Sequence, residues 1–317
     1  MTDPTADSTV PPARSSKSKR GFDFNHEQPA ELEKIGWKLI QDEFPKFDEL
    51  ESKLSGEYMV IEPRSSLDLD DQYLGQYRMG TLHRSALGAA VDSLNTIRAI
   101  IRDAGVLPMT GLYPLIRAAI ENSSLAIHLI APESRDVRLR RAYRAMAEEV
   151  DKQVRFLITM GQSEDAAKRR IRRTSEISAL IEMRPTLGPP AALLKVKETH
   201  TEIVALADAA IRRDPAVTSP ESLPLLAIWQ LLSGMSHAKQ WAMVAALERS
   251  GAIVDTDRRG AQIKMTSSSF FVGSILKRAT ESVEVALRYY GQRSKAAWAL
   301  PEDAEEPRLR TTPDPCN

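Results

Sequence analysis

Cysteine is almost absent from this chain, which has one among 317 residues, Cys316. A single cysteine can form neither an intrachain disulfide nor a thiolate zinc site. Aromatic residues amount to 6% and glycines number 15, too few for a protein of many strands and tight turns. The sequence also lacks an apolar run of about 18 residues, and its first residues lack the apolar core of a secretory signal. We therefore expect a cytoplasmic protein in a reducing setting, with no membrane partner.

Alanine, leucine, arginine and glutamate are abundant instead, and these residues favour helices. Apolar residues recur at helical spacing in several long segments, and residues 111–132 are apolar almost all round, which is typical of a central, buried helix. One piece differs, because residues 251–266 read as two short strands joined by a polar turn. The sequence thus predicts an all-α fold, a helical bundle with one small β-hairpin near residues 252–266.

The ends of the chain differ in composition from its middle. Residues 1–27 and 301–317 are rich in polar residues and proline, so we predict disordered tails there. Between them, residues 28–300 are predicted to form a single helical domain. It consists of an N-terminal helix with an acidic loop (28–70) and a bundle core (71–300).

Within that domain the apolar pattern and the prolines predict individual elements. We expect a helix from Pro29 to Leu54, bent or interrupted at Pro45 because proline removes a backbone donor. The other expected elements are an extended or strand-like piece at 58–63 and helices at 71–104, 111–132, 133–161, 163–182, 191–213, 220–236 and 267–291.

Acids and bases balance at 43 each, but they are unevenly placed. Residues 31–71 hold 12 acids and 5 bases, a net charge of −7, whereas residues 133–173 hold 12 bases and 7 acids, a net charge of +5. This polarity could steer a partner, let one part of the molecule dock on another, or reflect two solvated faces. If the protein binds RNA, the basic segment 135–173 would supply the contact.

Most motifs that identify a chemistry are missing. The sequence has no G-x-G-x-x-G, no phosphate-binding loop, no H-E-x-x-H and no E-x-x-H, so we expect neither a cofactor nor a metal. Ser233 and Ser236 precede His237, but they follow a helical stretch rather than the strand of a nucleophile elbow. Arg78 and His83 have the arginine–histidine spacing of HEPN ribonucleases, a match expected once by chance in a chain this rich in arginine.

A polar stripe crosses the apolar helix predicted at 111–132. Arg117, Glu121, Ser124 and His128 are spaced by four, three and four residues and so share one face. A buried arginine and glutamate must be paired, so the stripe is either a structural pair that fixes helix register or the wall of a pocket. In the second case His237 would arrive from the later helix, and the three side chains could bind a phosphate and move a proton.

Two fragments together resemble a known group of proteins. Arg117 to Glu121 gives R-A-x-x-E on the apolar helix, and Ser233 to His237 gives S-x-x-x-H on a later one. This combination resembles helical proteins of actinobacteria and phages that are loosely related to HEPN-like and abortive-infection proteins. The resemblance implies a helical bundle, often a homodimer, with relatives that cleave RNA or act as toxins or in defence.

We therefore expect a soluble binding or interaction protein in a setting such as phage defence or regulation. The alternative is a HEPN-like, RNA-directed ribonuclease or toxin that uses Arg117, Glu121 and His237 as its catalytic residues.

Overall fold

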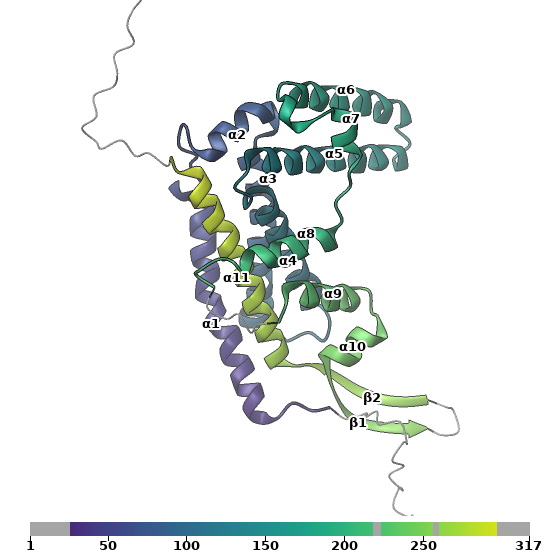
Figure 1. Ribbon diagram of the computed structural model, residues 1–317. Coiled ribbons are helices and arrows are strands. Elements are labelled where there is room, and N and C mark those ends of the chain that lie inside the picture. The colour runs from purple at the N-terminus through teal and green to yellow at the C-terminus, as the bar shows by residue number, and fades with distance from the viewer. Residues whose placement is uncertain (1–25, 218–222, 256–259, 297–317) are drawn as a thin grey trace, which may run out of the picture.

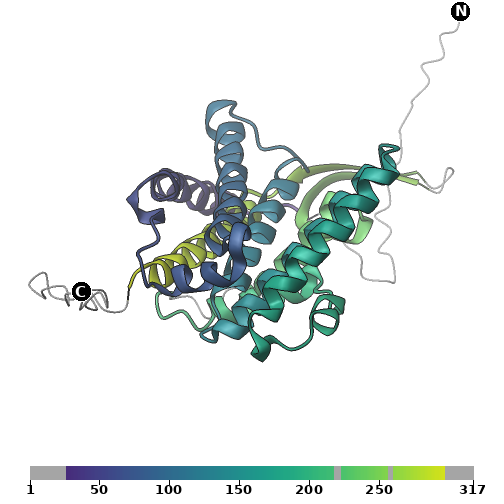
Figure 2. The same cartoon turned by 90° about the horizontal axis from the view of Figure 1, so that it is seen from above.

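The computed structural model describes residues 26–217, 223–255 and 260–296. In these ranges the chain forms eleven α-helices and one two-stranded antiparallel sheet, which confirms the all-α fold with a hairpin (Figures 1 and 2). The helices are α1 (Ala30–Ser55), α2 (Ser66–Leu74), α3 (Met79–Arg98), α4 (Leu112–Ile130), α5 (Arg135–Thr159), α6 (Ser163–Glu182), α7 (Pro190–Lys195), α8 (His200–Ile211), α9 (Leu225–Ser236), α10 (Gln240–Ala246) and α11 (Ser269–Ser294). The strands are β1 (Leu247–Asp255) and β2 (Gly260–Ser267).

Helix α4 lies at the centre of the molecule, as its apolar sequence predicts. It packs against α3 and α11 on one side and against α8 and α9 on the other. Most of its side chains are buried, including Ile116, Ile120 and Ile127. The neighbouring helices therefore cover the apolar surface that runs almost all the way round α4.

Helices α1 and α11 run side by side along one edge of the molecule (Figure 1). Their backbones approach closely at two glycines. A Cβ atom added at Gly36 would lie 2.2 Å from the backbone nitrogen of Phe270, and one added at Gly273 would lie 2.8 Å from the carbonyl oxygen of Gly36. Only glycine leaves room for this contact between the first and the last helix.

Helices α5 and α6 form an antiparallel hairpin, here called the arm (residues 135–182), that extends to one side of the α1–α11 pair (Figures 1 and 2). Its root is Arg138, which is buried to 1% exposure. The guanidinium donates to both carboxylate oxygens of Asp70 in α2, to Ser66, and to the carbonyl oxygens of Pro132 and Glu133. All of its donor groups are thereby used, which is what a buried charge requires.

The carbonyl end of α4 receives two further arginines. Arg141 of α5 donates to the carbonyl oxygen of His128 at 2.6 Å, and Arg293 of α11 donates to those of Ile130, Ala131 and Pro132. Guanidinium groups are favourable here because the last carbonyls of a helix lack intrahelical partners and carry a partial negative charge. These contacts fix where α4 ends and where the arm begins.

Some predicted details differ from the structure. Helix α1 has about the expected bounds, and of the two alternatives at Pro45, a bend or an interruption, the interruption is wrong, because that proline and Gln41, whose carbonyl loses its donor, are both exposed to water. The predicted acidic loop is helix α2, begun by Ser65, whose side chain accepts from the Asp68 amide. The piece at 58–63, expected to be extended or strand-like, contains no strand; a short 3-10 turn, Glu57–Met59, opens it, and Val60 after the turn is extended.

Two predicted long helices are each divided. The helix expected at 71–104 breaks after α2, where Gly75 has a positive φ of 55°, and resumes as α3. The helix expected at 191–213 is two helices, α7 and α8, joined by the extended segment 196–199. Thr199 begins α8 with a capping box that Glu202 completes. Helix α10 was not predicted.

The other predicted helices are confirmed, and α6 begins and ends where the sequence indicated. The predicted disordered tails, 1–27 and 301–317, lie outside the described residues except for residues 26 and 27. His26 pairs through its backbone with Arg249 of β1. Among the described residues, no helix is both long enough and apolar enough to cross a membrane.

Removing the carboxylate beneath Arg138 should destabilise the fold. In Asp70→Asn the buried guanidinium loses its countercharge, so we expect the free energy of unfolding to fall by about 3 kcal/mol. Asp103→Asn is the matched control, because it disrupts only the exposed pair with Arg102 and should leave the urea midpoint nearly unchanged. Urea denaturation of both variants measures the difference, and equal losses would contradict a structural role for the Asp70–Arg138 pair.

Acid should weaken the fold through His83. This side chain is fully buried and stacks on Tyr290, with ring centroids 5.0 Å apart. Burial lowers the pKa of His83 to about 3. The unfolded chain, with a histidine pKa of about 6.5, therefore binds a proton that the folded protein does not, so stability falls as the pH drops from about 6.5 towards 3.

At pH 5 this histidine alone should reduce the free energy of unfolding by about 2 kcal/mol relative to pH 7. His83→Phe should lack that part of the pH dependence, whereas His200→Gln, which changes an exposed histidine, should retain it. Urea denaturation at pH 7 and pH 5 gives the comparison. An identical pH dependence in wild type and His83→Phe would refute the argument.

Candidate functional site

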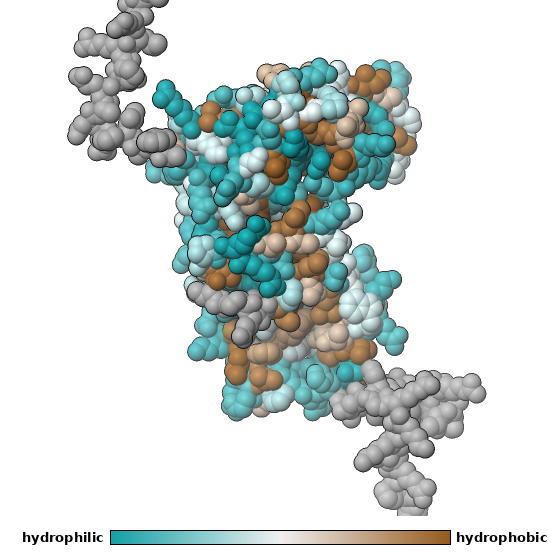
Figure 3. Space-filling model, viewed as in Figure 1, coloured by the Kyte–Doolittle hydropathy of each residue, from teal (hydrophilic) through white to brown (hydrophobic). Residues whose placement is uncertain are grey.

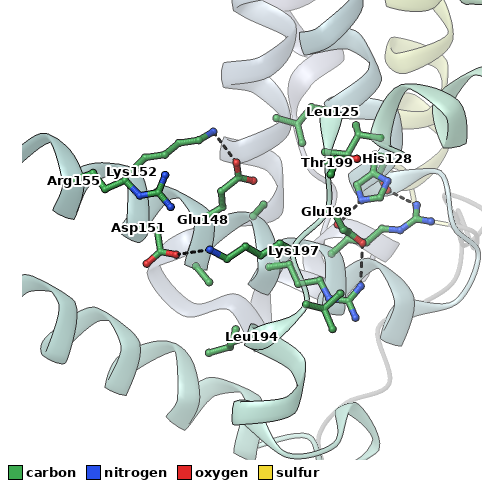
Figure 4. A pocket seen from close by; sticks show the side chains of 16 residues that line it. Leu125, His128, Glu148, Asp151, Lys152, Arg155, Leu194, Lys197, Glu198 and Thr199 are labelled. Carbon is green, nitrogen blue, oxygen red and sulfur yellow. Dashed lines mark hydrogen bonds and ion pairs between the residues drawn. The ribbon is translucent and has the colours of Figure 1, made fainter. Parts of the chain in front are cut away.

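A pocket of about 280 Å³ lies between the arm and the body of the molecule. Its walls come from three places: helix α4, the body-facing side of α5, and the segment that ends α7 and begins α8 (Figure 4). In the space-filling view the surface is hollowed on this side, between the arm and the helices below it (Figure 3). The break between α7 and α8 creates the pocket, because the extended segment 196–199 forms one wall.

The lining of the pocket is partly apolar and partly charged. Six apolar side chains contribute to the lining: Leu125, Ala145, Ala147, Leu194, Val196 and Ile203. The charged lining residues are five bases and three acids: Arg141, Arg144, Lys152, Arg155, Lys197, Glu148, Asp151 and Glu198. A concave, partly apolar surface with a few converging polar groups is the usual form of a small-molecule site.

Glu198 links the body to the arm across this pocket. One of its carboxylate oxygens lies 2.9 Å from Nε2 of His128 in α4, and the other accepts from Arg144 of α5 at 3.0 Å (Figure 4). Burial alone would raise the pKa of Glu198, but the contacts with His128 and Arg144 outweigh it and bring the pKa below its usual value. The carboxylate is therefore ionised at neutral pH.

Two buried nitrogens of this cluster have no hydrogen-bond partner among the described residues. Because an ionised Glu198 only accepts, Nε2 of His128 carries the hydrogen of their bond. His128 is 2% exposed, and its Nδ1 has no hydrogen-bond partner among the described residues. The same is true of Nε of Arg144. Unsatisfied buried polar atoms are costly; they occur at several other described residues, such as His83, Arg117 and Ser124, but here two residues that carry them line one pocket.

The remaining acids of the pocket are neutralised within it, but two bases are not. Glu148 pairs with Lys152, and Asp151 lies 3.6 Å from Lys197 (Figure 4). Arg141 and Arg155 have no carboxylate within ion-pair distance among the described residues. Burial lowers the pKa of the Arg141 guanidinium, a sign that its charge is only partly compensated.

The stripe predicted on α4 is divided between two neighbourhoods. Arg117 and Glu121 pair at 2.7 Å, as expected. Trp229 of α9 donates its indole N–H to Glu121 at 2.8 Å, and the Arg117 guanidinium lies 5.7 Å from the centre of the same ring. The pair and the indole thus bind α4 to α9. His128, two turns beyond Glu121 on the stripe, instead contacts the pocket residue Glu198 through its ring and Arg141 through its carbonyl oxygen.

His237 ends α9 and is exposed. Its backbone N–H donates to the carbonyls of Ser233 and Gly234, and no described side-chain hydrogen bond or ion pair joins it to Arg117 or Glu121. A shared site for these three residues stays a prediction. The close contact expected at this turn is present, since a Cβ atom at Gly234 would lie 2.6 Å from that of Ala242 in α10.

The other residues singled out in the sequence have structural partners. Ser236 donates to the carbonyl of Leu232 within its own helix. His83, of the Arg78–His83 spacing, is enclosed in the core against Tyr290. Neither is available to a substrate in this arrangement. Among the described residues, no group of three histidine, cysteine, aspartate or glutamate side chains could hold a metal ion.

Most bases of the segment 135–173 are engaged within the protein. In addition to the contacts of Arg138 and Arg141, five bases form ion pairs: Arg135 with Asp70, Lys168 with Glu164, Arg170 with Asp151, and Arg172 and Arg173 with Glu176. Arg140 donates a hydrogen bond to the carbonyl oxygen of Thr186. These pairs spread over several faces of the arm. They reduce the positive charge that a nucleic acid would meet.

The sequence reasoning missed Glu198, Arg141 and Arg144 as site residues. Glu198 was placed inside a helix, where nothing marked it. The T-x-x-E pattern of Thr199 and Glu202 was a readable signal, because it begins a helix and so leaves the preceding residues outside one. No pattern in the sequence could show that the arm folds back beside this segment.

The chain matches no protein-family model, and neither a curated protein nor a solved structure matches it significantly. The resemblance to HEPN-like and abortive-infection proteins therefore stays a prediction, and function has to be argued from the geometry of this pocket.

Proposed function

We propose that this protein is a binding protein that takes a small molecule into the pocket between the arm and the body. The observation that carries the proposal is the cluster of His128, Glu198 and Arg144. These side chains come from three separate elements, converge on one cavity, and retain two unpartnered buried nitrogens. The cavity is what marks this cluster, because unpartnered buried atoms also occur in structural places such as the Arg117–Glu121 pair, where Nε of Arg117 has no hydrogen-bond partner among the described residues.

Binding is favoured over catalysis because the pocket holds no activated nucleophile. Thr199 is the only lining residue with a hydroxyl group, and that hydroxyl donates to Glu202 in the capping box. A candidate general base does not by itself define a reaction. It also needs a group to activate and a substrate of known chemistry. The setting we propose remains regulation or phage defence, with ligand binding as the input.

A HEPN-like ribonuclease or toxin that uses Arg117, Glu121 and His237 stays the alternative. The Glu121 carboxylate already accepts from Arg117 and Trp229, and His237 is exposed at a turn. RNA binding by the segment 135–173, a homodimer and a cytoplasmic location also stay predictions. The homodimer has one supporting feature, the exposed apolar side chains Phe156, Ile158 and Met160 at the end of α5.

The binding proposal is tested with a panel of small organic compounds of different charge. A compound at a concentration of 100 times its Kd should raise the Tm by on the order of 5 °C. Ala145→Phe fills the pocket from its α5 wall and should abolish the increase. Ala89→Phe, at an exposed position of α3, is the matched control and should respond as the wild type does.

Differential scanning fluorimetry measures the Tm, and circular dichroism checks that both variants remain folded. The proposal fails if no compound raises the Tm of the wild type, or if the Tm rises equally in Ala145→Phe.

The ribonuclease alternative is tested by expression in bacterial cells. If the protein only binds a ligand, total RNA and growth should be the same for wild type, Glu121→Gln and His237→Ala. RNA electrophoresis and growth curves give the readout. RNA loss with wild type that disappears in soluble, folded His237→Ala would instead establish the nuclease.

A further inference from the structure

We infer that the ligand of this pocket is a small amphipathic organic anion, a carboxylic acid with an apolar body. The inference rests on the proposed function and specifies its ligand. It follows from three features of the pocket: the charge balance of its lining, the apolar part of that lining, and its size.

The charge balance favours an anion. Every acid of the lining is already paired: Glu148 with Lys152, Asp151 with Lys197, and Glu198 with His128 and Arg144. A cationic ligand would have to displace one of these bases. Arg141 and Arg155, in contrast, have no carboxylate partner among the described residues. A ligand carboxylate at Arg141 would supply the pairing that the protein leaves open there, and Arg155, 14 residues further along the same helix, would add a more distant positive charge.

The position of Arg141 strengthens this argument. It is half-buried, and its described hydrogen bond, to the carbonyl oxygen of His128, uses one terminal nitrogen. A guanidinium presents five N–H donors in a planar fork that matches the two oxygens of a carboxylate. Arg141 therefore has donors to spare, at the end of the pocket nearest Glu198 and His128.

The apolar part of the lining favours a ligand with an apolar body. Leu125, Leu194, Val196 and Ile203 come from both sides of the pocket, and the exposed part of Val196 adds to the surface that a ligand would cover. Covering such surface is favourable by about 25 cal/mol per Å². A compact inorganic anion would leave this surface in contact with water.

The size of the pocket limits the length of that body. Its volume of about 280 Å³ is close to the lower end of the range for ligand sites. At roughly 30 Å³ for each heavy atom, the share of a water molecule in the liquid, it holds about nine heavy atoms. An acid of roughly eight carbons, which has ten heavy atoms, is close to this size, whereas a nucleotide or a long-chain lipid would extend well beyond the pocket.

The test compares three eight-carbon probes that differ only in their head group: octanoate, 1-octanol and octylamine. Isothermal titration calorimetry with the full-length protein should give a Kd for octanoate at least tenfold lower than that for octanol. Octylamine should bind most weakly. The affinity for octanoate should also decrease as the salt concentration rises, while that for octanol should not.

Variants assign the head-group contact. Arg141→Gln should weaken octanoate binding about tenfold and leave octanol binding unchanged, and Arg141→Lys should fall between the two. Arg155→Gln, at an exposed position, tests the second base without risk to the fold and should weaken octanoate binding by a smaller factor. Arg102→Gln, an exposed arginine outside the pocket, is the matched control and should bind as the wild type does.

The outcomes separate this inference from the proposed function. If octanol or octylamine binds as tightly as octanoate or more tightly, and Ala145→Phe abolishes that binding, the inference of an anionic ligand is wrong. The pocket would still be a binding site. Octanoate binding that both Arg141→Gln and Arg155→Gln retain in full would also overturn it. If none of the three probes binds, the inference fails, and the compound panel with Ala145→Phe decides the proposed function independently.

Discussion

The buried charge of Arg138 is the constraint on which the rest of the structure depends. A guanidinium at 1% exposure is tolerable only if all of its donors are used, and they are used on two separate pieces of chain. Asp70 and Ser66 belong to α2, and the two carbonyls belong to the turn after α4. One side chain therefore sets the position of α2, the end of α4 and the start of the arm.

The pocket follows from that arrangement. With the root of the arm fixed, α5 runs beside the segment 196–199, and Glu198 meets Arg144 of the arm and His128 of the body. Arg141 has two roles, because it caps α4 through the carbonyl of His128 and also lines the pocket. The structural cap and the proposed binding site thus share one helical turn. A change in the arm's position would alter the pocket directly.

The opposite charges of residues 31–71 and 133–173 have a partial explanation in this junction. Asp70, from the acidic stretch, accepts from Arg135 and Arg138 of the basic stretch. Docking of one part of the molecule on another was one of the three interpretations of that asymmetry. Many remaining charges form ion pairs within the arm, which contribute little individually to stability at exposed positions.

The sequence by itself determined the helical class, the central place of α4, the hairpin and the Arg117–Glu121 pair, because all of these depend on local spacing. It also contains the capping box that begins α8. Only the tertiary structure decided that Glu198, 70 residues from His128 and 54 from Arg144, lies against both. Periodicity shows which face of a helix is polar, but not which element covers that face. That choice depends on how the arm packs, which long-range contacts such as Asp70–Arg138 determine.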